Sequence, residues 1–578
     1  MKLMGTLTLS CAMVISLFSS GRALAQVSDT LHLYADATGG PSFLQQIEAD
    51  TTATGQRKDP NRVYVLQQTG SVDTVYYWYN NMISNFNVTI IGKRNPVTGM
   101  PPVVSPGVRP DGTAPVYFLA PRGNGNIITL KNLYILGETY DGLHFISDLI
   151  NESGDSTTVI LDHDVIDNCA PFLAYMNGSW CNYFMENCDF RNASNQFWQA
   201  GGCVWGYGGA PLDTVWMVNN TFFGLGRCVM GGPGFVKYTR YDHNTNFLGT
   251  GGLFLMTAGM FDAQIENNIF YGVEAHGADS AYVQRGNANF ADQPFGVIQI
   301  DSMGGIASQY NVTEAERNIT VKNNAYYWPQ QLYAFWHAVD DTAPGLLDPP
   351  EWMNPQTAFM FSDKNAWPNL IAANNDSVDP GFNTTMDTSA VDSLVKFIKL
   401  IGYPPGNAGS FRWWYLPTNP NVLHVFDQFP KNWGGWSTGY PVPENLAYSN
   451  AALQSGGTDG WALGDLNWYP SQLKQFNEGK VNAVIPGPQL PARFDLSQNY
   501  PNPFNPSTEI RVSLHSSGMM SLKVYNVLGQ LVDVVARGFR PAGDYVYNVN
   551  MDRFASGVYF YTLRQGASSI TKKMVLLK

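Results

Sequence analysis

The sequence has few charged side chains, few cysteines and, beyond its first residues, no long apolar run. Asp, Glu, Lys and Arg make up only 14% of the 578 residues, which argues against a coiled coil or an ordinary helical enzyme. Because no segment after residue 25 is long and apolar enough to span a bilayer, we expect no transmembrane segment. The cysteines after that point, which form no zinc pattern, are Cys169, Cys181, Cys188, Cys203 and Cys228. Their odd number excludes complete pairing within one chain, and either one or two disulfides or buried free thiols fit the sequence.

Positive charge is also in deficit. The chain has 34 basic and 46 acidic residues. Its first residues combine a basic start, a short apolar run and the small-x-small ending Ala23-Leu24-Ala25, which predicts a secretory signal peptide over residues 1–25. Lys2 and Arg22 lie in this peptide, so the remainder has 32 basic and 46 acidic residues and a net charge of −14. We therefore expect no nucleic-acid partner, because phosphate binding needs concentrated positive charge.

What the chain has in abundance is a repeated segment. Short alternating strands, each followed by a polar turn, recur along the middle of the chain, as in Trp216–Phe222 and Gln264–Phe270. Their anchor positions are Asn132, Asp164, Cys188, Asn220, Asn244, Asn268 and Asn324. Recurrence at this spacing predicts an all-β fold, a right-handed parallel β-helix solenoid, in which each segment begins a coil. The anchors should stack, so that side-chain amides hydrogen-bond along the helix axis.

The repeats also predict where the solenoid begins and ends. The clearest coils run from about Ile127 to Tyr327, with earlier strands at Arg62–Leu66 and within Phe86–Ala120 and a short helix near Phe43–Ala49. The step from Asn268 to Asn324 holds either an extra coil or a long loop, and its Gly, Asp and Asn content favours a loop. Residues 328–480 are interpreted as a loop-rich C-terminal cap.

Strand alternation divides each coil into inward and outward positions. Positions three and five residues before the anchor are mostly apolar and should face the core. Positions two and four before it should face outward. The outward column at minus two comprises Asp162, Glu186, Val218, Asp242, Glu266 and Lys322. The outward column at minus four comprises Ile160, Phe184, Trp216, Arg240, Gln264 and Thr320.

The outward columns contain the candidate chemistry. Stacked carboxylates repel unless a cation separates them, so Asp162, Glu186, Asp242 and Glu266 are candidate calcium ligands. Elimination on a uronate polymer also needs a base and a group that stabilises the developing charge. Arg240 and Lys322 are the candidates for the base, and Trp216 is a candidate platform for a sugar ring.

Three interpretations of this face stay open. Polar outward residues are what solvation of a surface strand produces, and the same residues would serve a binding groove or a catalytic site. Hydrolysis is disfavoured, because the local patterns Asn-Thr-Asp, Gly-His-Gly and Arg-Ile-Lys are absent from the sequence. A solenoid that only displays its surface, as an adhesion scaffold, is the non-catalytic alternative.

The end of the chain carries a second set of motifs. A Pro-rich linker over 484–493 precedes alternating strands typical of a small Ig-like β-sandwich over 494–578. Residues 499–506 read Asn-Tyr-Pro-Asn-Pro-Phe-Asn-Pro, and Leu528-Gly529, Gly557-Val558-Tyr559 and Lys572–Lys578 follow in order. This segment resembles the type A C-terminal sorting domain of the type IX secretion system. The resemblance implies recognition by the outer-membrane translocon of that system, and delivery to the medium or to the outer surface.

The repeat region in turn resembles the parallel β-helix superfamily that includes pectate lyases, over roughly Arg62 to Tyr327. The domains expected are thus a signal peptide (1–25), a β-helix with its caps (26–483), the linker and the sorting domain. The function expected is binding of, or action on, an extracellular acidic polysaccharide, with a calcium-dependent lyase as the sharpest form.

Overall fold

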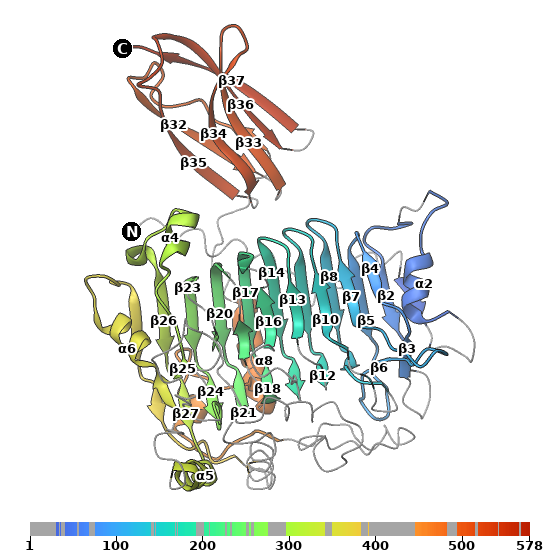
Figure 1. Ribbon diagram of the computed structural model, residues 1–578. Coiled ribbons are helices and arrows are strands. Elements are labelled where there is room, and N and C mark those ends of the chain that lie inside the picture. Colours follow the sequence, from blue (N-terminus) through green and yellow to red (C-terminus); the bar gives the residue numbers. More distant parts are fainter. Residues whose placement is uncertain are drawn as a thin grey trace. The chain divides into compact units, whose positions relative to one another are not determined.

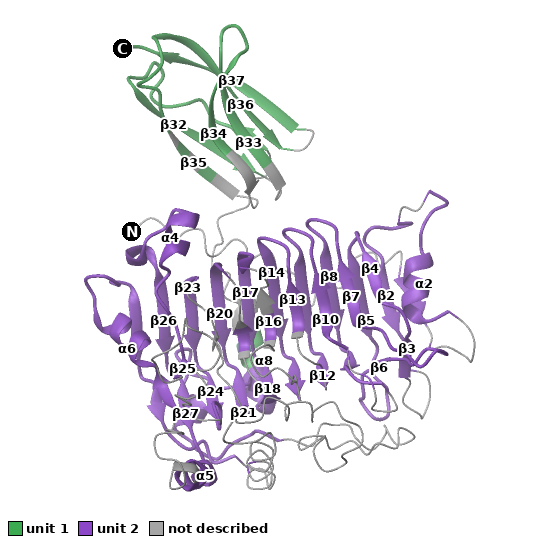
Figure 2. Cartoon of the chain, viewed as in Figure 1, with its two compact units in different colours: residues 1–26, 474–578 green, residues 27–473 purple. Residues whose placement is uncertain are grey.

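The structure is a computed structural model, and it forms two compact units, which are described separately below (Figure 2). One unit comprises residues 27–473, and the other comprises residues 1–26 with residues 474–578. The predicted signal peptide and the linker over 484–493 lie outside the described residues. The residues that the structure describes are 30–33, 35, 41–54, 57–68, 75–139, 144, 146–167, 169, 172–191, 202–206, 209–225, 228–231, 234–249, 254–255, 259–275, 296–340, 350–382, 391, 445–482, 494–514, 518–540, 543–565 and 568–578.

Three all-parallel sheets run along the larger unit, which is a parallel β-helix (Figure 1). Each coil contributes one strand to each sheet over most of the length. The first sheet has eleven strands, in sequence order: β1 (Thr30–Leu33), β2 (Val63–Leu66), β5 (Val88–Gly92), β8 (Ile127–Lys131), β11 (Thr158–Asp162), β14 (Cys181–Glu186), β17 (Leu212–Val218), β20 (Val236–Asp242), β23 (Met260–Glu266), β26 (Asn318–Lys322) and β29 (Leu370–Ala373).

The other two sheets complete each coil. The second sheet contains β3 (Val75–Trp78), β6 (Val103–Pro106), β9 (Tyr134–Leu136), β12 (Val165–Asp167), β15 (Asp189–Arg191), β18 (Thr221–Leu225), β21 (Thr245–Gly249), β24 (Ile269–Tyr271), β27 (Ala325–Tyr327) and β30 (Asp376–Ser377). The third contains β4 (Met82–Ser84), β7 (Tyr117–Pro121), β10 (Asp148–Glu152), β13 (Phe172–Met176), β16 (Gly202–Gly206), β19 (Cys228–Gly231) and β22 (Phe254–Leu255).

The predicted inward positions form the core. Leu161 pairs with Met185, Met185 with Met217, and Tyr241 with Ile265 in neighbouring strands of the first sheet, and each is at most 1% exposed. Burial of a side chain of this size stabilises the fold by about 1.5–3 kcal/mol. The stacked apolar columns therefore hold successive coils in one register.

A polar corner joins the first sheet to the second. The residue that directly follows each strand of the first sheet from β8 to β29 has a left-handed backbone, with φ between 52° and 59°, a conformation that suits Asn and His among non-glycine residues. The members of this left-handed column are Asn132, His163, Asn187, Asn219, His243, Asn267, Asn323 and Asn374. The next residue in each coil occupies the position of the predicted ladder.

The ladder is confirmed from Asn220 through Asn324, and it continues to Asn375, which the sequence reasoning missed. The Asn244 Oδ1 accepts hydrogen bonds from the Asn220 backbone N–H at 3.1 Å and from the Asn220 Nδ2 at 3.0 Å. The Asn244 Nδ2 donates to the Met217 carbonyl at 2.9 Å and to the Asn268 Oδ1 at 3.2 Å. The same set repeats at the next two positions.

Two predictions about the repeats need correction. Asn132 is not in the ladder: Lys131 pairs with Asp162, so Asn132 falls in the left-handed column and Leu133 takes the ladder position, where its N–H donates to Asp164 Oδ1. The solenoid is also longer than predicted, because the first sheet runs from Thr30 to Ala373. The long step from Asn268 to Asn324 adds no strand to the first sheet between β23 and β26, which pair directly, so the favoured alternative to an extra coil is confirmed there.

The helices lie outside the three sheets. The predicted helix α2 (Phe43–Ala49) is confirmed, and its Phe43 ring packs against Tyr76 and Phe118. Later come α4 (Gly305–Tyr310), η2 (Glu314–Glu316), α5 (Gln330–Asp340), α6 (Pro355–Ser362), η5 (Leu453–Ser455), η6 (Leu466–Trp468) and α8 (Pro470–Asn482), with β25 (Gly296–Ile298) paired to β28 (Glu351–Met353). No helix in the described ranges is long and apolar enough to cross a membrane.

The smaller unit contains an antiparallel β-sandwich, as predicted. Its core includes Ile510, Leu522, Tyr561 and Met574, which are at most 2% exposed. One sheet has the order β31 (Asp495–Leu496), β32 (Ser507–Leu514), β35 (Gly543–Asn550). The other has the order β34 (Leu531–Arg540), β33 (Gly518–Asn526), β36 (Gly557–Gln565), β37 (Ser568–Leu576).

Of the two alternatives left by the sequence, disulfides or buried free thiols, the structure has free thiols among the described cysteines. Among the described side chains, Cys169, Cys181, Cys188 and Cys203 are buried free thiols. Burial raises the pKa of the Cys169, Cys181 and Cys188 thiols, so these side chains stay protonated at neutral pH. They are packing elements of the stack rather than reactive groups.

Candidate functional site

The outward face of the first sheet carries all the predicted site residues, but it divides into two unlike halves. Over β11, β14 and β17 the outward residues are buried: Ile160, Phe184 and Trp216 are 3–7% exposed. Over β20, β23 and β26 the outward residues Arg240, Gln264, Glu266 and Lys322 are half-buried. Solvation of a surface strand, one of the three interpretations of this face, therefore does not account for the outward residues of the first half.

The buried carboxylates of the first half have partners of their own. Asp162, 2% exposed, pairs with the Lys131 ammonium and with His163 Nδ1, and accepts from Asn187 Nδ2 at 3.4 Å. Burial alone would raise the pKa of Asp162, but the hydrogen bond and charge of His163 and the charge of Lys131 outweigh burial and lower it. Asp162 is thus held as a carboxylate by neighbouring side chains.

Trp216 has an internal role in place of the predicted sugar platform. Its Nε1 donates to Glu186 Oε1 at 2.7 Å, and the Arg240 guanidinium lies 4.8 Å from its ring centroid. The ring therefore contacts Glu186 on one side and carries a cation–π contact with Arg240 on the other, while Val218 lies between Glu186 and Asp242 in the stack. With 7% of its surface exposed, Trp216 presents little area to a ligand.

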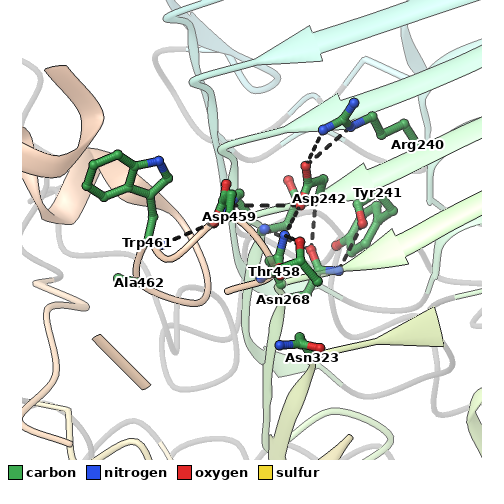
Figure 3. A network of polar contacts seen from close by, with 12 residues as sticks. Arg240, Tyr241, Asp242, Asn268, Asn323, Thr458, Asp459, Trp461 and Ala462 are labelled. Atoms are coloured by element: carbon green, nitrogen blue, oxygen red, sulfur yellow. Dashed lines mark hydrogen bonds and ion pairs between the residues drawn. The ribbon is translucent and has the colours of Figure 1, made fainter. Parts of the chain in front are cut away.

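Asp242 lies at the centre of a polar network at the boundary between the halves (Figure 3). Its Oδ2 accepts from Arg240 Nε at 3.2 Å and Nη2 at 2.6 Å, and its Oδ1 accepts from Asn267 Nδ2 at 2.9 Å. Burial works to raise the pKa of Asp242, but the charges of Arg240 and His243 lower it overall. Arg240 is therefore bound to a carboxylate and remains protonated, which makes it unsuited to act as a base.

A distant segment, Gly456–Trp468, follows the polar corner and joins this network. Asp459 Oδ2 lies 2.9 Å from Nε2 of the fully buried His243, and the Thr458 hydroxyl accepts from Asn267 Nδ2 at 3.0 Å (Figure 3). Asp465 continues the contact, with its Oδ2 accepting from the Thr221 hydroxyl at 2.8 Å. We call Gly456–Trp468 the strap.

The buried ionisable groups at the strap are tuned by their partners. Burial works to lower the pKa of His243, but the charge of Asp242 and the hydrogen bond to Asp459 raise it overall. Burial raises the pKa of Asp465 to about 7, against the opposing effect of hydrogen bonds from Asn467 and Thr221. Sequence reasoning missed both strap acids, since they lie more than two hundred residues after their partners.

The outward side chains of β23 and β26, in the second half of the face, differ from those of the first half in their burial and hydrogen bonding. Gln264, Glu266, Thr320 and Lys322 are half-buried, and within the described part of the chain their side chains make no hydrogen bond or ion pair. Burial, followed by the charge of Asp242, raises the pKa of Glu266, while Lys322 and Arg240 oppose the shift. We call Gln264, Glu266, Thr320 and Lys322 the open strip.

Asp262 extends the same face and was missed by the sequence reasoning. It lies two residues before Gln264 on β23, so the alternation that identified the outward columns would have found it at position minus six. Burial raises its pKa to about 6. The strand β23 thus presents two carboxyl groups with raised pKa values, Asp262 and Glu266, on either side of Gln264.

The four predicted calcium ligands are not brought together. Asp162 pairs in register with Glu186, and Asp242 pairs with Glu266, but Val218 on β17 lies between the two pairs. Both Asp162 and Asp242 are also bonded to cationic side chains. Among the described residues no group of three His, Cys, Asp or Glu side chains has an arrangement that could hold a metal ion. Like charges in the stack are therefore offset by Lys131, His163 and Arg240.

Comparisons with known proteins identify the end of the chain. Residues 498–577 match the family described as the secretion system C-terminal sorting domain, which confirms the predicted type IX sorting domain. The protein is accordingly secreted or attached to the outer cell surface, and the type IX machinery is its export partner. No curated protein and no solved structure matches the chain.

Proposed function

We propose that the protein binds extracellular polysaccharide along the open strip of the first sheet. The observation that carries the proposal is the contrast within one face: the flanking polar side chains are bonded to each other, whereas Gln264, Thr320 and Lys322 have hydrogen-bonding groups without partners among the described residues. Half-buried polar groups of this kind are best satisfied by a ligand or by water.

The composition of the strip indicates the kind of polymer. An amide and a carboxyl group on β23 and a hydroxyl and an ammonium group on β26 lie on adjacent parallel strands about 4.8 Å apart, so a chain rich in hydroxyl groups meets donors and acceptors at both coils. Lys322, with Arg240 at the edge, favours a polymer that also carries carboxylates. Export to the cell exterior brings the protein to such polymers.

A calcium-dependent lyase is a narrower form of the same proposal. It would place a cation near Glu266 and use Lys322, the one predicted base without an ion-pair partner among the described residues, to remove a proton. The bonds already made by Asp162 and Asp242 favour binding over elimination, so lyase activity is an outcome of the test rather than our conclusion.

Electrophoresis of the full chain in native gels that contain a polysaccharide tests the proposal. We expect acidic polymers such as polygalacturonate and alginate to retard the protein, and Gln264→Ala and Lys322→Ala each to weaken binding roughly tenfold. Thr129→Ala is the matched control, because Thr129 is a half-buried outward residue of β8 on the same sheet.

Absence of retardation by every acidic and neutral polymer would refute the proposal and leave the solenoid as a display scaffold. An ultraviolet assay for unsaturated uronate, run on the same polymers with calcium and with chelator, separates the two forms. Calcium-dependent absorbance that is lost in Lys322→Ala would establish the lyase.

A further inference from the structure

An aromatic cluster lies where the strands of the first sheet begin. It consists of Trp180, Phe235, Phe261 and Tyr310, of which Trp180 directly precedes β14, Phe235 directly precedes β20, and Tyr310 ends α4. Tyr310 stacks on Phe235 with ring centroids 4.4 Å apart, and Phe235 contacts Phe261 at 5.8 Å. Figure 1 shows α4 at the end of the sheet where β26 starts.

Trp180 makes T-shaped contacts with two rings of this cluster. Its ring meets Tyr310 edge-on at 5.7 Å and 90°, and Phe235 at 6.1 Å and 72°. Trp180 is nevertheless 39% exposed, and within the described residues its indole N–H makes no hydrogen bond. The perpendicular contacts orient the ring, and the exposed part of the indole is available for stacking on a flat ligand.

The backbone of Trp180 adds an independent observation. Its φ is 61°, and it follows Gly125 and Ser156 in a column of left-handed residues, each of whose N–H bonds to the next coil. Glycine adopts this conformation without strain, whereas a bulky side chain pays about 1–3 kcal/mol for it. Tryptophan is therefore a poor choice for this turn on stability grounds alone.

The cluster is aligned with the open strip. Phe235 lies five residues before Arg240 on the same strand, which is roughly 16 Å at the rise of a β-strand. Asp262, Gln264 and Glu266 follow Phe261 along the adjacent strand. Trp180 precedes β14, three strands from β23 in the sheet, so a polymer that contacts the strip can reach Trp180 by running obliquely across β20 and β17 toward the start of the strands.

We propose that Trp180, supported by Tyr310, is a stacking subsite for a pyranose ring of the bound polysaccharide. This inference rests on the proposed function and assigns the part of the site that recognises the apolar face of the sugar. The indole N–H donates to a ring hydroxyl or carboxylate at its edge. The subsite adds affinity for pyranose polymers in general, and the open strip supplies the preference for acidic ones.

The test uses the full chain in the same native-gel assay. Trp180→Ala and Trp180→Gly should weaken binding roughly tenfold, while Trp180→Phe should retain most of it because a ring remains. Phe359→Ala is the matched control, because Phe359 is a 55% exposed aromatic residue of α6 outside the cluster. Tryptophan-fluorescence unfolding of each variant checks folding.

The glycine variant separates binding from packing. Trp180→Gly relieves the backbone strain but also loses the ring contacts to Phe235 and Tyr310, so a binding role predicts that this variant is still folded in the buffer of the binding assay, as its unfolding curve will show, yet binds weakly. Unchanged binding in Trp180→Gly, together with an intact effect of Lys322→Ala, would overturn this inference and leave the proposed function standing. If the wild type is not retarded at all, both fail.

Discussion

Replacing Asn244 by alanine tests whether the amide ladder holds the coils together. The Asn244 side chain is fully buried and makes four hydrogen bonds, two of them to the backbone N–H of Asn220 and the carbonyl of Met217. Alanine leaves those two backbone groups buried and unsatisfied, at about 1–3 kcal/mol each. We therefore expect Asn244→Ala to lower the free energy of unfolding by about 2–6 kcal/mol.

The chain offers a matched control and a selective probe. Asn375, at the end of the ladder, makes the same kinds of bond but is half-buried, so water can replace its amide and Asn375→Ala should cost only about 0.5–1.5 kcal/mol. All 15 tryptophans precede residue 494, so tryptophan fluorescence in guanidinium follows the solenoid without the sandwich. Equal midpoints for the two variants would refute the reasoning.

A second substitution at the same position adds a pH test. Asp164 occupies the ladder column, and burial holds its pKa well above the usual range. By the same physics Asn244→Asp should carry a carboxyl group that stays protonated in the folded state. Because the folded state then binds more protons than the unfolded state, this variant should gain stability as the pH falls toward 5. A pH-independent difference from the wild type would contradict this account.

Three further predictions concern the strap, a corner glycine and the sorting domain. Because burial raises the pKa of Asp465 to about 7, from an unfolded value of about 3.9, the stability of the solenoid should fall as pH rises between these values. Asp465→Asn should flatten that slope in tryptophan-fluorescence unfolding, and an unchanged slope would assign it to other groups. Gly178→Ala should cost about 1–3 kcal/mol in the same assay, because its Cβ would lie 2.2 Å from the Gly154 carbonyl oxygen, whereas Gly305→Ala, in open space, should be tolerated. Deleting residues 494–578 should leave the protein in the periplasm by fractionation and immunoblot, and its continued release would contradict a sorting role.

The sequence was sufficient for features that depend on neighbours in the repeat. Alternation identified the inward column through residues such as Leu161, Met217 and Ile265, because strand geometry sends every second side chain to the same face. Recurrence identified the ladder, because parallel coils place equivalent residues above one another. The sorting domain was also recognisable, since its motifs lie within one short module.

Only the tertiary structure decided which outward residues remain open to a ligand. Asp162, Trp216 and Asp242 follow the same pattern as Glu266 and Lys322, yet the first three are buried and bonded to partners. The strap reaches His243 from Asp459, a contact that no local pattern encodes. Alternation fixes the direction of a side chain, but its exposure depends on which distant segments and neighbouring side chains pack over it, and that is settled only when the whole chain is folded.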